Sequence, residues 1–311
     1  MFNENFDLKQ YESFDYDNLK HAYKEAFNRE FLEKDHYERR FKAGKYFSSF
    51  LILERKTQKI VGHTGFKISN LNPKIKGKIA FRYSTFIAKD FRGNGIYSYL
   101  MNYACKELKI NFNVKFIFAW PNKINLISCL KDSKYINLDP IITWQLNLDD
   151  FIQKVNWKNE LPNINYTFIS LKDSKFDFDI SHRENYLTYE SSNDLKSILF
   201  ERDNKKYFYI AYENMYSIIG YSILNKTKYL SIILNRGFEI NLLLSIIKLY
   251  FKGNNFIVQL WCDKSDRYLL RSILKENFIP NGPIFFNGVY ELTGDEFPKE
   301  LLIAMYNHDA F

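Results

Sequence analysis

Cysteine is scarce in this chain of 311 residues, with three in all. Cys105, Cys129 and Cys262 lie far apart, and they lack the close spacing of metal ligands. Disulfide-dependent secreted proteins usually carry even sets of cysteines, and zinc sites carry closely spaced pairs. The sequence therefore predicts neither a disulfide framework nor a metal site, and it favours a reducing, cytoplasmic location.

Long apolar runs and basic clusters are missing as well. The longest apolar stretch, near residues 242–251, contains Ser245 and Lys248 and is too short to span a bilayer. The N-terminus is acidic and does not resemble a signal peptide. Although the net charge is +8, lysine and arginine are scattered, whereas a nucleic-acid-binding face needs them clustered. We expect no membrane span and no nucleic-acid partner.

Apolar residues are abundant enough for real cores, at 46% of the chain. The length corresponds to about two domains of ~100–200 residues each. In the first half, helical spacing occurs at 17–28 and 35–47. The elements expected after these are strands at 50–54, 59–68 and 78–88, a helix at 96–108, a strand at 115–120, a helix at 122–132 and a strand at 141–148. This order predicts a mixed α/β domain.

The second half repeats this plan. Trp120 lies 25 residues after Gly95, and Trp261 lies 24 residues after Gly237. Each tryptophan follows a strand-like segment and precedes a helix-like one. Chance similarity in a biased composition is the alternative, but the pattern favours a tandem duplication. We expect domains at 1–155 and 163–311.

A glycine-bearing turn at residues 90–95 separates a predicted strand from a predicted helix. Backbone N–H groups at a helix N-terminus bind anions, and Gly93 and Gly95 would let phosphate oxygens approach them. Arg92 adds positive charge. A dinucleotide-binding fingerprint would need a third glycine where Ser98 stands, and the G-x-x-x-x-G-K-[ST] phosphate loop is absent.

This turn resembles the acyl-CoA-binding motif [QR]-x-x-G-x-[GA] of the GNAT superfamily of N-acetyltransferases. Arg92 and Gly95 match it, while Tyr97 replaces the last small residue. The order of elements is similar too. The match looks closest to bacterial members associated with surface-polysaccharide or amino-sugar pathways. The segments that carry this likeness are Ile60-Val61-Gly62-His63, Ser84-Thr85, Arg92-Gly93-Asn94-Gly95-Ile96-Tyr97 and Pro121-Asn122.

The resemblance implies tandem GNAT-like acyl-CoA N-acyltransferase domains with an α/β fold and a mixed sheet. It implies direct transfer of an acetyl group from acetyl-CoA, as co-substrate, to a primary amine without a metal. The implied cofactor-binding residues belong to the strand end, the turn, the helix start and the next loop: Phe86, Ile87, Ala88, Arg92, Gly93, Asn94, Gly95, Ile96, Tyr97 and Asn122.

Amine attack on a thioester benefits from a general base and a proton donor. His63 is the candidate base, because histidine titrates in the right range. Thr85 is a candidate for orienting the substrate, and Tyr97 is a candidate acid or pocket wall. For all three the alternative is a purely structural role. The tyrosine that serves as acid in many family members is missing, since its place falls near Cys129 or Leu130.

The second half has lost the glycine turn, since Gly237 is followed by Phe238, which would crowd a pyrophosphate. We expect this copy to be degenerate and to wall the acceptor site, with Tyr207, Tyr209 and Tyr216 as surface aromatics. The acceptor is expected to be a small-molecule amine, with the amine of a nucleotide-linked amino sugar as one candidate. A peptide or another amine, or a non-catalytic CoA-binding or interaction module, are the alternatives. The sequence leaves the oligomeric state open.

Overall fold

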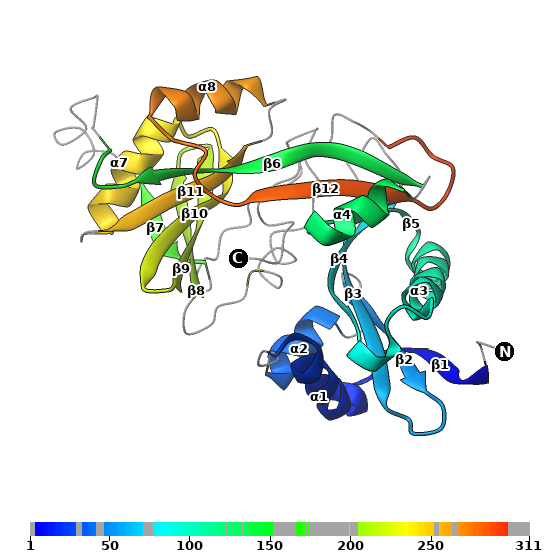
Figure 1. The fold of residues 1–311 in the computed structure, drawn as a ribbon. Helices are drawn as coiled ribbons and strands as arrows, with labels where there is room; N and C mark the ends of the chain where they lie inside the picture. Colours follow the sequence, from blue (N-terminus) through cyan, green and yellow to red (C-terminus); the bar gives the residue numbers. More distant parts are fainter. Residues whose placement is uncertain are drawn as a thin grey trace. The chain divides into compact units, whose positions relative to one another are not determined.

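The computed structural model describes residues 4–28, 33–41, 47–70, 77–121, 123–131, 134–151, 166–171, 173, 199, 205–251, 255–262 and 266–297. The chain forms two compact units, each made of two stretches of sequence. Unit 1 comprises Met1–Leu138 and Asn287–Lys299, and unit 2 comprises Asp139–Phe286 and Glu300–Phe311. Figure 1 labels the helices and strands of both units.

Unit 1 contains a sheet with strand order β1-β2-β3-β4-β5-β12. Strands β4 and β5 are parallel neighbours, and the other neighbouring pairs are antiparallel. Its elements are β1 (Phe6–Gln10), η2 (Ser13–Asp15), α1 (Tyr16–Phe27), α2 (Lys34–Phe41), β2 (Phe47–Glu54), β3 (Ile60–Asn70), β4 (Lys78–Ile87), η3 (Lys89–Phe91), α3 (Ile96–Phe112), β5 (Val114–Ala119), α4 (Lys123–Leu130), the start of β6 (Tyr135–Asn147) and most of β12 (Ile284–Glu291).

Helices cover both faces of this sheet (Figure 1). On one face, α3 presents Ile96, Leu100, Ala104 and Leu108, which are at most 2% exposed and pack against sheet residues. Burial of each large apolar side chain contributes ~1.5–3 kcal/mol, so the helical spacing of these residues fixes α3 on the sheet. On the opposite face, a second core gathers around Leu19 of α1.

The elements predicted for the first half are confirmed in kind and order, with shifted ends. Helix α2 ends at Phe41, short of the predicted residue 47, because Phe47 already begins β2. Strand β1 was not predicted, since it has only two apolar residues, Phe6 and Leu8, in its five.

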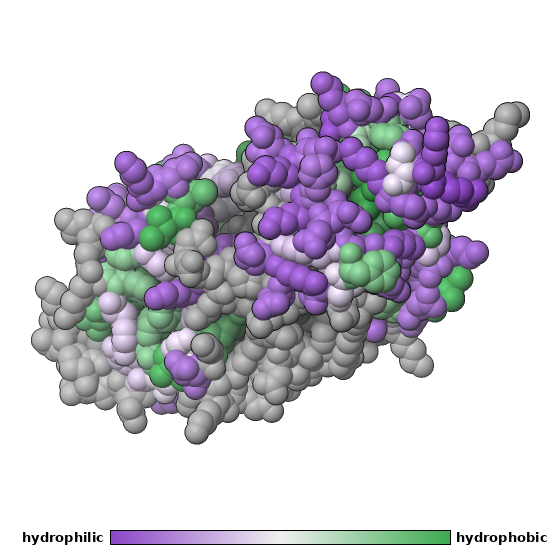
Figure 2. Space-filling view, turned by 90° about the horizontal axis from the view of Figure 1, so that it is seen from below, coloured by the Kyte–Doolittle hydropathy of each residue, from purple (hydrophilic) through white to green (hydrophobic). Residues whose placement is uncertain are grey.

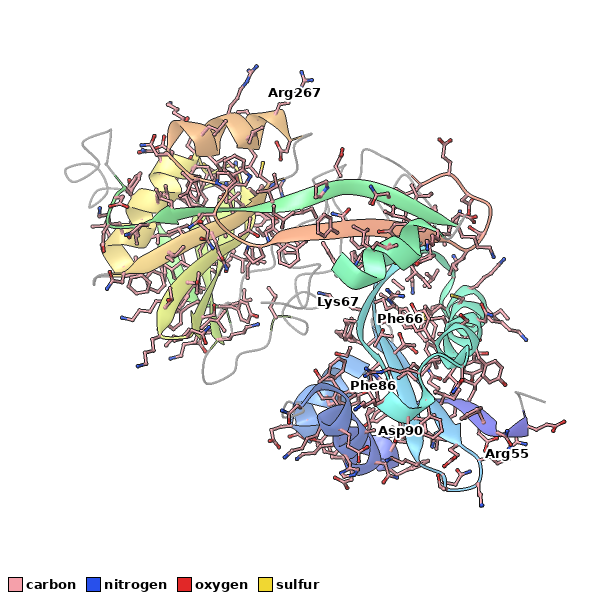
Figure 3. All side chains as sticks on the ribbon, in the orientation of Figure 1. Arg55, Phe66, Lys67, Phe86, Asp90 and Arg267 are labelled. Carbon is pink, nitrogen blue, oxygen red and sulfur yellow. The ribbon has the colours of Figure 1, made fainter. Side chains whose placement is uncertain are left out.

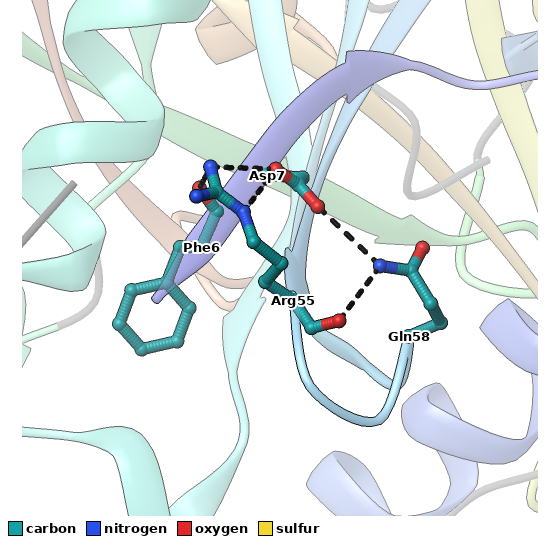
Figure 4. A network of polar contacts seen from close by, with 4 residues as sticks. All are labelled: Phe6, Asp7, Arg55 and Gln58. Atoms are coloured by element: carbon teal, nitrogen blue, oxygen red, sulfur yellow. Dashed lines mark hydrogen bonds and ion pairs between the residues drawn. The ribbon is translucent and has the colours of Figure 1, made fainter. Parts of the chain in front are cut away.

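A polar network ties β1 to the turn between β2 and β3 (Figure 4). The Arg55 Nε atom donates to Asp7 Oδ1 at 2.9 Å, and Gln58 Nε2 donates to Asp7 Oδ2 at 3.3 Å. Exposed ion pairs of this kind contribute ~0–1 kcal/mol. The network therefore sets the position of β1 more than it stabilises the unit.

Unit 2 repeats the plan of unit 1, with strand order β6-β11-β10-β9-β8-β7. Strands β10 and β11 are parallel, as β4 and β5 are in unit 1. Its elements besides β6 are β7 (Thr167–Ser170), β8 (Lys205–Tyr212), β9 (Met215–Leu224), β10 (Thr227–Arg236), α7 (Ile240–Tyr250), β11 (Phe256–Cys262), α8 (Arg267–Lys275) and the start of β12. The predicted tandem repeat is confirmed by this shared topology.

The two halves of the sequence exchange strands. Strand β6 begins in unit 1 and pairs with β11 of unit 2, from Ile142 to Asn147. Strand β12 begins in unit 2, and its residues Gly288–Glu291 pair with β5 of unit 1. Each unit therefore obtains one strand of its sheet from the other half of the chain. The predicted division at 155 and 163 lies outside the described residues and stays a prediction.

The described residues visible on one face of the molecule are mostly polar (Figure 2). On the face shown in Figure 2, hydrophilic residues cover wide areas and apolar residues form smaller separate patches. None of the helices formed by the described residues has the length and apolar character needed to cross a membrane.

Candidate functional site in unit 1

The parallel strands β4 and β5 separate part-way along their length. Their register runs from Lys78 opposite Val114 to Phe81 opposite Phe118. Strand β4 then continues to Ile87 and remains paired with β3, up to Gly62 opposite Ile87. Beyond Phe81, β4 therefore offers backbone on its β5 side to an extended ligand that adds as a strand does.

The glycine turn follows the free end of β4. Gly93 and Gly95 have φ values of +82° and +72°, which side chains other than glycine rarely adopt. A Cβ atom at either position would meet no protein atom within 4 Å. Gly95 is the N-cap of α3 and supplies no side-chain cap. The first N–H groups of α3 are therefore left without a side-chain cap, beside two glycines that face free space. This arrangement is suited to an anion.

Arg92 holds this turn against the end of β4. Its Nε atom donates to the carbonyl oxygen of Ile87 at 2.9 Å. The amide of Ala88 donates to Val61 of β3 at 2.8 Å. A ligand amide that pairs with the Ile87 carbonyl must therefore share this acceptor with Arg92 or replace it.

The side chains of the three predicted strand residues point into the protein. Phe86, Ile87 and Ala88 are 5–9% exposed. Phe86 lies in the core formed with α1 and α2 (Figure 3). These residues can serve a ligand only through their backbone, as predicted. Among the remaining predicted cofactor residues, Asn94 is exposed and Ile96 is buried. Asn122 lies outside the described residues.

His63 is fully buried on the α1 and α2 side of the sheet, with both ring nitrogens bonded. Its Nδ1 atom lies 2.7 Å from the carbonyl oxygen of Ser84 and must donate to it. Its Nε2 atom lies 2.8 Å from the Tyr37 hydroxyl, which donates to it when the ring is neutral. Burial lowers the pKa of His63 to about 4, against a weaker opposing effect of the Ser84 bond. The ring is therefore neutral at pH 7.

This histidine supports an irregular point in β4. The register between β3 and β4 shifts between His63 and Gly65, and Ser84 has a φ of +50°. A positive φ is costly for a residue with a side chain. The bond from His63 to the Ser84 carbonyl fits a role in holding this bulge, whereas a base needs a free lone pair facing its substrate.

The low pKa of His63 predicts a stability loss in acid. The unfolded ring has a pKa near 6.5, so between pH ~6.5 and ~4 the unfolded state binds more protons than the folded state. Stability from this group is complete above pH ~6.5 and falls by about 3 kcal/mol as pH drops to ~4. Urea unfolding should show this slope in the wild type and not in His63→Gln. The control is His21→Gln, because the His21 side chain is 71% exposed. A slope that survives in His63→Gln contradicts the assignment.

Thr85 and Tyr97 lie in different surroundings. Thr85 is half-buried, and its Oγ1 atom lies 2.9 Å from Oγ1 of Thr64 on β3. Tyr97 lies in the first turn of α3. Helix α3 covers the sheet face opposite α1 and α2 (Figure 1), whereas His63 bonds to Tyr37 of α2. The predicted catalytic residues His63 and Tyr97 are thus not brought together on one face.

Tyr97 belongs to a polar cluster at the point where β4 and β5 separate. We call Arg82, Tyr97, Cys129 and Tyr290 the splay cluster. The Arg82 guanidinium donates to the Tyr97 hydroxyl and lies 5.9 Å from the ring centroid. Burial of the hydroxyl raises the pKa of Tyr97, although 41% of the residue is exposed, and Arg82 opposes this rise. Tyr290 bonds to Cys129 by a side-chain hydrogen bond. Tyr290 could not be predicted as a member of this cluster, because β12 lies more than 150 residues after β5 in the sequence.

The corresponding turn of unit 2 is closed. Gly237 has a φ of +82°, but a Cβ atom there would lie 2.8 Å from Met215 Cγ. Phe238 is 4% exposed and packs into the core of unit 2. The prediction that Phe238 crowds a phosphate is therefore wrong. Glu239 is the N-cap residue of α7, makes no side-chain cap bond and adds a negative charge next to this helix start, which disfavours an anion.

The predicted surface aromatics of the second half are also buried. Tyr207, Tyr209 and Tyr216 are 4–7% exposed, so the prediction of surface positions is wrong. Tyr209 and Tyr216 pack against each other with ring centroids 6.2 Å apart. A tyrosine side chain combines an apolar ring with a polar hydroxyl, and in these three residues the ring is buried with the core.

Residues 16–129 match the model of the acetyltransferase (GNAT) family. The matched segment contains the β4–β5 pair, the glycine turn and α3. No curated protein sequence matches the chain significantly.

Solved structures extend the likeness over nearly the whole chain. A GCN5-related N-acetyltransferase from Anabaena variabilis has a TM-score of 0.67 at 12% identity, covering 93% of this chain and 73% of its own. A tandem GNAT protein from the clavulanic acid biosynthesis pathway has a TM-score of 0.52 at 11% identity, covering 94% and 100%. A glucosamine N-acetyltransferase region of a fungal GH3 β-N-acetylglucosaminidase has a TM-score of 0.59 at 10% identity, covering 92% and 38%. The predicted mixed α/β, GNAT-like fold is confirmed.

Proposed function

We propose that unit 1 binds acetyl-CoA and transfers the acetyl group to a primary amine. The observation that carries this proposal is the joint occurrence of two features. The parallel strands β4 and β5 separate after Phe81 and Phe118. The turn that follows β4 leads into an uncapped helix through two glycines that open onto free space.

The residues present fit such a cofactor. A Cβ at Gly93 or Gly95 would take up space that the protein leaves open, and the turn residues 92–96 carry the N–H groups for a pyrophosphate. Arg92 supplies a positive charge next to them. The backbone of 86–88 is the proposed partner for the amides of the pantetheine arm. The bound thioester supplies an activated acetyl group.

The acceptor must arrive as a neutral amine, because an ammonium has no lone pair for attack. The backbone beyond the separation point of β4 is the proposed donor to the developing oxyanion. Thr85 is proposed to orient the acceptor, and Tyr97 to border the reacting sulfur. His63 was predicted to be the base. Its two engaged nitrogens and its low pKa fit a positioning role for Ser84 better.

For the acceptor we propose the amine of an amino sugar, including nucleotide-linked ones. This choice is supported by the resemblance of the segments at 60–63, 84–85, 92–97 and 121–122 to that subgroup. The similarity of fold to a glucosamine N-acetyltransferase region is in keeping with it. The net charge of +8 is compatible with an anionic nucleotide. Peptide amines and other small amines belong in the same test.

The proposal predicts one binding site per chain and amine-dependent turnover. Calorimetry should give about one equivalent of acetyl-CoA, because Met215 crowds the unit 2 turn at Gly237 and Glu239 adds a negative charge beside it. A thiol-release assay should show free CoA only when an accepted amine is present. The amine panel should contain glucosamine, a nucleotide-linked amino sugar, a lysine peptide and a polyamine.

Each outcome separates one part of the proposal. Two equal sites would contradict the closed turn of unit 2, and no binding would remove the cofactor assignment. Binding without thiol release from any amine would favour a non-catalytic CoA-binding module.

A further inference from the structure

Tyr290 brings a phenol from the C-terminal end of the chain to the separation point in unit 1. In the β5–β12 register, Tyr290 lies opposite Ile117 and Gly288 lies opposite Ala119. The next residue of β5 after Ile117, Phe118, forms the last pair with β4. Tyr290 therefore lies on one side of β5, at the same level at which β4 separates from the other side of β5.

Its contacts hold this phenol beside α4. Tyr290 is half-buried and packs against the small core of Ala119, Cys129 and Tyr135. The Tyr135 and Tyr290 ring centroids are 5.1 Å apart. The hydroxyl of Tyr290 is hydrogen-bonded to Cys129, and Arg82 and Tyr97 act on it electrostatically. Polar groups from β4, α3 and α4 therefore act on the one phenol that β12 supplies.

We propose that Tyr290 donates a proton to the sulfur that leaves during acetyl transfer, with Cys129 positioning its hydroxyl. This inference rests on the proposed function. It places the proton donor in the exchanged strand β12, next to Cys129 and Leu130, where the sequence offers no phenol on α4.

The step balances in atoms and charge. The amine nitrogen forms a bond to the thioester carbonyl carbon, and the C–S bond breaks with its electron pair going to sulfur. The sulfur takes the proton of the Tyr290 hydroxyl, giving a thiol and a phenolate. The proton lost by the attacking nitrogen then returns the phenolate to phenol. The net products are an amide and a free thiol.

Burial and the bond to Cys129 raise the pKa of Tyr290, so its proton is in place at neutral pH. The Arg82 guanidinium opposes part of this rise and so favours the phenolate that forms when the proton is passed on. Arg82 is the first residue of β4 after its last pair with β5, so its charge lies at the separation point.

Tyr290→Phe in the full chain tests the proposal, because it keeps the ring and removes the hydroxyl. General acid–base groups contribute ~10²–10⁴-fold, so kcat should fall by at least about 100-fold. The KM for acetyl-CoA should stay within about threefold, since the phenol acts on the breaking bond and not on binding. The matched control is Tyr135→Phe, which removes a neighbouring buried hydroxyl that has no hydrogen-bond partner among the described residues. That control should keep its kcat.

The outcomes are distinct. An equal loss in Tyr135→Phe would show a packing effect and overturn the proposal. An unchanged kcat in Tyr290→Phe would also overturn it, and a loss of about 100-fold in Cys129→Ala or Tyr97→Phe would then indicate where the donor lies instead. A wild-type chain that releases no thiol with any amine removes the proposed function, and this inference with it.

Discussion

A fragment of residues 1–155 is expected to release no thiol from acetyl-CoA, even with an amine that the full chain accepts. The fragment lacks the segment of β12 that pairs with β5. It also lacks Val289 and Phe297, which are at most 3% exposed. Each buried apolar side chain contributes ~1.5–3 kcal/mol, and a whole domain is stable by only ~5–15 kcal/mol.

Polar contacts of the same segment would be lost as well. Lys115 Nζ lies 3.1 Å from Asp295 Oδ2, and the amide of Leu292 donates to the carbonyl oxygen of Lys115 at 2.9 Å. Loss of β12 leaves β5 as an open strand edge, which promotes aggregation. Residual binding of acetyl-CoA would be compatible with this expectation, because the glycine turn stays in the fragment.

The control restores only the missing strand. Residues 284–297 can be added as a peptide or fused behind residue 155 through a flexible linker. A urea or thermal melt should become more cooperative when they are present, and a scrambled peptide should have no effect. Full amine-dependent turnover by the bare fragment would show that unit 1 does not need β12.

Gly95→Trp is expected to abolish acetyl-CoA binding in calorimetry while the chain stays folded. The space beyond Gly95 is open in the protein, so the indole would meet the ligand rather than the core. The positive φ of +72° adds strain of ~1–3 kcal/mol for any non-glycine residue. Strain and ligand exclusion must therefore be separated.

Gly294→Trp is the matched control for that variant. Gly294 has a φ of +84°, lies in unit 1 and also has no atom within 4 Å of a Cβ position. Gly294 follows β12, and its neighbour Asp295 pairs with Lys115 near the start of β5, at the opposite end of the parallel β4–β5 pair from the glycine turn. The variant should therefore reproduce the strain without the loss of binding. If Gly95→Trp binds acetyl-CoA as tightly as Gly294→Trp and the wild type, the pyrophosphate must bind elsewhere.

The sequence predicted those parts of the fold that depend on neighbouring residues. The spacing of Leu100, Ala104 and Leu108 predicts α3, and two glycines within three positions predict its turn. The pairing of β12 with β5 could not be predicted, because strand partners distant in sequence leave no periodic signal. For the same reason Tyr290 was missed, although the absence of a phenol near Cys129 was noticed.

The chemistry of single residues was harder to predict than their location. His63 was correctly placed in a strand pair. Its protonation state and hydrogen bonding, however, depend on Tyr37, on Ser84 and on complete burial. These bonds come from α2 and β4 and are set by tertiary structure. Phe238 shows the same limit, because the sequence could not tell whether its ring faces solvent or core.

The exchange of β6 and β12 also sets the order of events during synthesis. Strand β5 pairs through Ile117 with Tyr290, so its partner leaves the ribosome roughly 170 residues later. At ~5–20 residues per second this delay is roughly 10–35 s. During that time β5 carries an unpaired edge and the splay cluster lacks one member. A chain that stops or is clipped ahead of β12 thus cannot assemble the cluster, and folding of the site in unit 1 depends on synthesis through β12.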